Sequence, residues 1–103
     1  MTYEFHPEAR VEYREAALFY DTRRSGLGAA FTLEVEAALA RILEAPERWR
    51  VIEQDVRRCL THTFPYGILY TIEAESILIV AVMHLRRRPG YWRDRLSDDG
   101  ETS

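Results

Sequence analysis

Apolar and polar positions follow one period in the first half of the chain and another in the second half. Residues 2–6 alternate, with Tyr3 and Phe5 on one face, which predicts a short strand. Apolar residues then recur every three or four positions up to Ile42, as in amphipathic helices. In the second half the period changes to two, with Tyr66, Ile68, Tyr70 and Ile72 on one side, which is typical of strands.

The helical part divides into two segments at Ser25-Gly26. The first helix is expected to begin at Pro7, because proline favours the first helical position, and to end with Gly26 as a left-handed cap. The second is expected to stop before Pro46. The short joint predicts an antiparallel helical hairpin. The two apolar stripes are Ala9, Tyr13, Ala16, Ala17 and Tyr20, and Phe31, Val35, Ala38, Leu39 and Ile42.

The second half predicts three strands after a loop that contains Trp49. "DVRRCL" begins the first strand, and "FPYGILYTI" forms the next, followed by a hairpin turn at "EAES". The unbroken apolar run 77–83 predicts a central strand covered on both faces. The order β-α-α-β-β-β predicts an α+β domain over residues 1–96, with the hairpin packed on a small, mainly antiparallel sheet. Residues 97–103 are expected to form a disordered acidic tail.

The stripes also predict which residues form the core. The helical hairpin is expected to bury one apolar face against the strands that follow it. The expected contacts join Phe31, Val35, Leu39 and Ile42 to Ile68, Tyr70, Ile77 and Ile79.

Charge is distributed unevenly along a chain whose net charge is −3. Residues 1–55 carry seven arginines against eleven acids, whereas residues 56–96 carry seven arginines against three acids. Five of these arginines fall in "HLRRRPGYWRDRL", residues 84–96. Such a segment is typical of a surface that meets phosphates or an acidic partner, although a solvated turn that balances the acidic helices is the alternative.

Several classes of protein are excluded by what the sequence lacks. No apolar run approaches the roughly 20 residues of a membrane span, and the first residues are not expected to act as a signal peptide. Cys59 is the only cysteine, which excludes an internal disulfide and favours the reducing cytoplasm. HExxH, CxxC and Gly-rich phosphate-loop motifs are absent, so no metal or nucleotide cofactor is predicted. Lysine is absent too, and arginine cannot act as a general base.

The predicted order of elements, together with "VRRCL", "FPYGILY" and "HLRRRPGYW", resembles the RelE/ParE superfamily of bacterial toxins, also called plasmid stabilisation proteins. The resemblance extends from Tyr3 to about Leu96 and implies the toxin of a type II toxin–antitoxin module, inhibited by a cognate antitoxin. A homodimer or a toxin–antitoxin heterotetramer would be its assembled form. RelE-like members cut messenger RNA on the ribosome, whereas ParE-like members inhibit DNA gyrase without cutting RNA.

The resemblance assigns roles to individual residues. Arg58, and Arg86 or Arg87, resemble the phosphate-binding positions of the ribonucleases, and Tyr91 resembles their C-terminal aromatic residue. His84 could transfer a proton, since imidazole titrates near neutral pH. The predicted catalytic set is Arg58, His84, Arg87 and Tyr91. The predicted substrate-binding residues are Arg57, Arg86, Arg88 and Trp92.

Each of these assignments has a structural alternative. His84 ends a buried strand and could be held there by hydrogen bonds, and at least one of Tyr91 and Trp92 is expected to cap the core. The first helix has Leu18 and Phe19 in addition to the apolar residues that one buried stripe can use. These two are therefore the predicted antitoxin-binding residues. The convergence of His84, the arginines and Tyr91 favours a ribosome-dependent ribonuclease. A gyrase inhibitor and a non-catalytic nucleic-acid-binding or adaptor module remain the alternatives.

Overall fold

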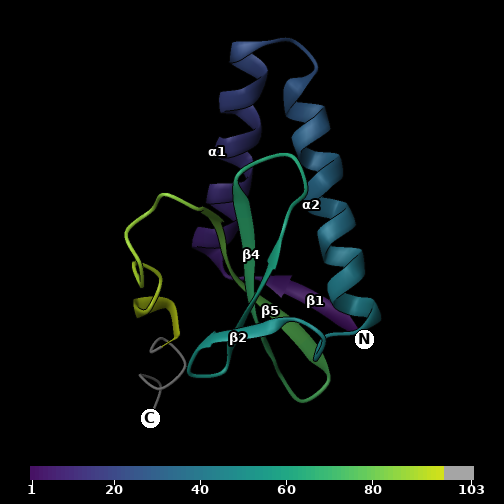
Figure 1. Cartoon of the computed structure of the whole chain (residues 1–103), viewed down its shortest axis with the longest axis vertical. Coiled ribbons are helices and arrows are strands. Elements are labelled where there is room, and N and C mark those ends of the chain that lie inside the picture. The colour runs from purple at the N-terminus through teal and green to yellow at the C-terminus, as the bar shows by residue number, and fades with distance from the viewer. Residues whose placement is uncertain (97–103) are drawn as a thin grey trace.

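Two antiparallel helices pack on one face of a five-stranded mixed sheet in the computed structural model, which describes residues 1–96 (Figure 1). The strand order is β1-β5-β4-β3-β2, and β1 is parallel to β5 whereas the other pairs are antiparallel. The predicted α+β class and mainly antiparallel sheet are therefore confirmed. The expected tail, residues 97–103, lies outside the described residues. The elements are β1 (Thr2–Phe5), α1 (Pro7–Arg23), α2 (Leu27–Glu44), β2 (Arg50–Glu53), β3 (Val56–Leu60), β4 (Tyr66–Ile72) and β5 (Ser76–His84).

The joint between the helices corrects one detail of the prediction. Gly26 has the left-handed backbone expected of it, with φ at 91°, but it precedes α2 as its N-cap. The first helix ends earlier, at Arg23, and its C-cap residue Arg24 is extended. The carboxylate of Asp21 accepts hydrogen bonds from the backbone N–H groups of Gly26 and Gly28, which holds the joint closed.

The predicted loop around Trp49 contains a strand that the pattern did not reveal. Arg50–Glu53 forms β2 and pairs with β3, so the observed order is β-α-α-β-β-β-β. Four residues are too few to establish a period, and a bulge between Val51 and Glu53 interrupts the pairing. The strand is therefore defined by its hydrogen bonds to β3 rather than by its own sequence.

The core between the helices and the sheet consists of the residues that the stripes predict. Phe31, Val35, Leu39 and Ile42 lie in one buried cluster with Ile68, Tyr70, Ile77 and Ile79. Within this cluster the hydroxyl of Tyr70 donates to the carbonyl oxygen of Pro46, at 2.6 Å. Burial raises the pKa of Tyr70 to about 12. The phenol therefore stays neutral in the core.

Truncating one of these core residues tests the packing of the hairpin. Leu39 is 2% exposed, so Leu39→Ala is expected to lower the free energy of unfolding by about 2–5 kcal/mol. The loss combines the removed apolar surface with the cavity left behind. Urea denaturation followed by circular dichroism measures it. Leu33→Ala is the matched control, because Leu33 is on the same helix and 71% exposed; an equal loss in both variants would contradict the assignment.

A second cluster covers the other face of the sheet and explains the long apolar run of β5. Val80, Ala81 and Met83 pack there against Trp92, which is 2% exposed, so the predicted capping of the core by an aromatic residue is confirmed. Val80 and Ala81 are consecutive and yet belong to the same cluster, because the β4–β5 register shifts between Leu69 and Tyr70. The strand lies between β1 and β4 and is buried on both faces, as predicted.

Candidate functional site

The C-terminal segment, residues 85–96, is fastened to α1 by the carboxylate of Glu12. Its Oε1 accepts hydrogen bonds from the backbone N–H of Val82 and from Nη1 of Arg95, both at 2.9 Å. Its Oε2 accepts from the hydroxyl of Tyr91 at 2.6 Å and from Nη2 of Arg95 at 2.8 Å. The side chains of Arg95 and Glu12 are only 8% and 14% exposed. This carboxylate therefore joins α1, β5 and the C-terminal segment.

The position of this network follows from the length of β1. That strand pairs with β5 only as far as Ile79, which leaves the next residues of β5 without a neighbouring strand on that side. Glu12 accepts from the N–H of Val82, and Arg95 donates to the carbonyl oxygen of Val80 at 3.0 Å. Two side chains thus replace the missing strand, because buried backbone groups need hydrogen-bond partners.

Sequence reasoning missed Glu12, although the pattern contained a signal for it. Glu12 is three residues after Ala9 and four before Ala16, so it lies on the buried stripe of α1. A carboxylate within an apolar stripe indicates a buried partner of opposite charge. Its partner Arg95 could not be chosen among the arginines of residues 84–96 from the sequence.

Two of the predicted catalytic residues lie against each other beside Glu12. The guanidinium of Arg87 lies over the ring of Tyr91, 3.8 Å from its centre, and Nη1 of Arg87 is 4.0 Å from Glu12 Oε2. The pKa of Tyr91 is raised well above its usual value, mainly by burial and to a lesser extent by the hydrogen bond to Glu12. The phenol of Tyr91 is therefore a poor proton acceptor at neutral pH.

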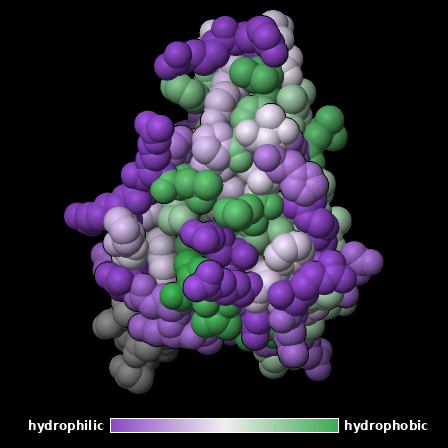
Figure 2. Space-filling model, viewed as in Figure 1, coloured by the Kyte–Doolittle hydropathy of each residue, from purple (hydrophilic) through white to green (hydrophobic). Residues whose placement is uncertain are grey.

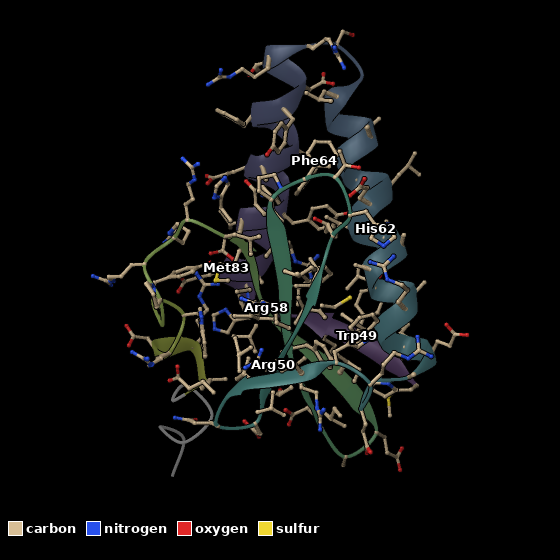
Figure 3. The ribbon with its side chains drawn as sticks, viewed as in Figure 1. Trp49, Arg50, Arg58, His62, Phe64 and Met83 are labelled. Carbon is tan, nitrogen blue, oxygen red and sulfur yellow. The ribbon has the colours of Figure 1, made fainter. Side chains whose placement is uncertain are left out.

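A hollow of about 240 Å³ on the sheet face opposite the helices brings Arg58 and Arg87 together; we call it the Arg58–Arg87 hollow. Arg58 alternates with Val56 onto this face (Figure 3). Its side-chain stem crosses Gly67. A Cβ at Gly67 would lie 3.0 Å from Cγ and Cδ of Arg58, so glycine makes room for the arginine. The hollow is lined by Ile52, Glu53, Arg58, Met83, Leu85, Arg87, Pro89, Gly90 and Trp92.

His84 lies on the other face of the sheet. Its ring packs edge-on against Tyr66, with 5.1 Å between ring centres, and its Nδ1 accepts the backbone N–H of Arg86 at 3.0 Å. It lines a separate hollow of about 320 Å³, which also includes Phe19 and Arg87; we call it the His84 hollow. Arg87 therefore lies between the two hollows, whereas Arg58 and His84 do not share one.

The remaining predicted residues are distributed as follows. Arg57 does not join Arg58, because its Nη1 donates to the carbonyl oxygens of Glu47 and Trp49, at 3.1 and 2.7 Å, on the helix side of the sheet. Arg86 and Arg88 are exposed and line neither hollow. The buried Trp92 contributes an edge to the Arg58–Arg87 hollow. Leu18 and Phe19 are 65% and 48% exposed on α1.

Two helices packed on a five-stranded mixed sheet, in this order of elements, fit the architecture of the RelE/ParE superfamily of toxins. Residues 3–89 match the family model described as "ParE toxin of type II toxin-antitoxin system, parDE", and the chain belongs to this family. It is accordingly the toxin of a two-component module and has a cognate antitoxin. No curated protein gives a significant match. Within residues 1–96, no helix is long and apolar enough to cross a membrane.

Proposed function

We propose that this toxin acts by binding DNA gyrase and inhibiting it, and not by cutting RNA. The observation that carries the proposal is the state of the groups that could move a proton. Tyr91 donates its hydroxyl to Glu12, and His84 uses Nδ1 to accept a backbone N–H on the opposite face from Arg58. Membership of the ParE family favours the same function.

The Arg58–Arg87 hollow suits binding better than catalysis. Its two guanidinium groups can bind an anion through their N–H donors but supply no general base. Its one carboxylate, Glu53, forms a two-point ion pair with Arg93, which holds the pKa of Glu53 below its usual value. On the same face, apolar side chains lie among hydrophilic ones (Figure 2). Arginine forks beside apolar surface are typical of protein interfaces that receive a carboxylate.

A RelE-like ribonuclease is the second candidate, and one observation favours it. Arg58 and Arg87 converge on one hollow, as two cations that bind a scissile phosphate would. Proton transfer would then depend on a group that the RNA or the ribosome brings into place. A non-catalytic adaptor would bind through the same arginines but would neither inhibit gyrase nor cleave RNA.

We also propose that the antitoxin covers Leu18 and Phe19. Both side chains are exposed on α1, and Phe19 lines the His84 hollow together with Arg87. An amphipathic segment on this surface could place a carboxylate on Arg87 while its apolar residues cover α1. The antitoxin would then bind Arg87, the same arginine that is proposed to contact gyrase.

Inducing the protein in a bacterial host distinguishes the candidate functions. The expected result is loss of supercoiling by gyrase in extracts, with messenger RNA intact, because the proposed site binds and does not cleave. Plasmid topology on agarose gels and primer extension on an abundant messenger measure the two effects. Cleaved messenger with normal supercoiling would contradict the proposal in favour of the ribonuclease. Neither effect would favour the adaptor.

A further inference from the structure

A cavity of about 580 Å³ lies beside the end of β3 and is larger than either hollow. It exists because β2 begins opposite Arg58, so Cys59 and Leu60 extend past the start of β2. The open edge is bounded on one side by α2 and on the other by the start of β2. We call it the Trp49 cavity, and it is lined by Arg41, Trp49, Arg50, Arg58, Leu60, Thr61 and His62.

Three arginines meet around this cavity without a neutralising acid. No carboxylate lines it, and Arg41, Arg50 and Arg58 form no ion pair with any residue of the described part of the chain. Arg41 donates from Nη2 to the carbonyl oxygen of Leu60 at 3.1 Å, which fixes its fork at the open edge and leaves its other donors available. In a protein with net charge −3, three like charges at one cavity indicate a site for an anion.

An aromatic ring stands beside these cations. Trp49 packs partly against the main core and also lines the cavity, together with Arg50, Arg58 and His62 (Figure 3). Its backbone is held by the hydrogen bond that its carbonyl oxygen accepts from Arg57 at 2.7 Å. The backbone of Trp49 is therefore held in place beside the cavity that its side chain lines.

We propose that the Trp49 cavity binds a nucleoside phosphate, with the phosphates between Arg41, Arg50 and Arg58 and the base against Trp49. Guanidinium forks match phosphate oxygens in pairs, and aromatic side chains stack on bases of any sequence. Three arginines at one cavity favour a ligand whose negative charges lie close together. The charges of a polyphosphate lie within a few ångströms of one another, whereas the carboxylates of an acidic peptide are single charges that lie farther apart. The volume lies in the range of small-ligand sites. This binding does not depend on gyrase inhibition or on Arg87.

Calorimetric titration of the purified full-length chain with ATP, tripolyphosphate and adenosine tests the proposal. ATP is expected to bind at least about fivefold more tightly than tripolyphosphate, because only ATP has a base to stack, and adenosine more weakly than either. Arg50→Ala is expected to weaken ATP and tripolyphosphate alike, by roughly tenfold. Trp49→Leu is expected to reduce the affinity for ATP to that for tripolyphosphate and to leave tripolyphosphate unchanged.

Arg14→Ala is the matched control. It removes an exposed positive charge from α1, outside the cavity, and is expected to change no affinity. Equal affinity of wild type and Arg50→Ala for ATP would overturn the proposal, as would equal affinity of the wild type for ATP and tripolyphosphate. Tighter binding of a hexaglutamate peptide than of ATP would also overturn it, in favour of an acidic protein partner. If Trp49→Leu does not fold, Arg50→Ala remains decisive, because Arg50 is exposed.

Discussion

Replacing Glu12 with alanine is expected to lower the free energy of unfolding by about 3–5 kcal/mol, the loss typical of breaking a buried ion pair. The variant removes both carboxylate oxygens that accept from Arg95, whose side chain is only 8% exposed. Arg95 keeps the carbonyl oxygen of Val80 and the exposed Glu8, 3.6 Å away. The variant also removes the acceptors for the N–H of Val82 and the hydroxyl of Tyr91. Since all three donors lie in or against β5, the C-terminal segment should separate from the sheet. Urea denaturation followed by circular dichroism measures the loss.

Two further variants serve as the control and as the rescue for this prediction. Glu15→Ala removes an exposed carboxylate from the same helix and is expected to change the stability by no more than about 0.5 kcal/mol. Adding Arg95→Met to Glu12→Ala removes a buried charge whose one remaining ion-pair partner among residues 1–96 is the exposed Glu8, 3.6 Å away. It also fills the space with an apolar side chain, so it should recover part of the loss. A loss below about 1 kcal/mol in Glu12→Ala would contradict the structural role of the network.

Replacing Arg87 with alanine is expected to weaken target binding by about 10- to 100-fold, the range for losing a charge-assisted hydrogen bond. Stability should hardly change, because the side chain is 51% exposed and its nearest carboxylate is 4.0 Å away. Toxicity on induction and pull-down of the target at equal expression measure the effect. Arg87→Lys should lose nearly as much, because lysine keeps the charge but not the fork or the stacking on Tyr91.

Arg14→Ala again is the matched control, since it removes one exposed arginine that lines neither hollow and is expected to keep full toxicity. Full toxicity of Arg87→Ala would mean that the C-terminal arginines only balance the acidic helices. Equal toxicity of Arg87→Lys and wild type, with loss in Arg87→Ala, would mean that charge alone matters at this position. Both results differ from the result expected for a bidentate contact.

The helices and the main core were predictable because they depend on short-range periodicity. The spacing of Phe31, Val35 and Leu39 places them on one side of α2 whatever the rest of the chain does. Alternation in "VRRCL" likewise requires Arg57 and Arg58 to point to opposite faces. It does not say which face meets the helices, because that depends on the partners of β3. The prediction therefore grouped two arginines that the sheet separates.

The candidate site was predicted only in part, for the same reason. The resemblance pointed to Arg58, Arg87 and Tyr91, and the fold brings Arg87 to each of the other two. It places His84 in a different hollow, because β5 turns that side chain toward α1. Strand β2 and the Trp49 cavity were missed, since four residues establish no period and the cavity combines α2, β2 and β3.

By itself, the sequence determined the fold class, both helices, the buried stripe of each, the doubly covered strand β5 and the basic character of the C-terminal segment. These properties are local, since periodicity and composition act over a few neighbouring residues. Only the tertiary structure decided which arginine meets which group. Glu12 and Arg95 are 83 residues apart, and their contact depends on where β1 ends and how β5 pairs with β4. Fourteen arginines have the same chemistry in the sequence, and packing alone decided their different surroundings. Arg95 became a buried partner, two arginines line the Arg58–Arg87 hollow and three line the Trp49 cavity, with Arg58 common to both.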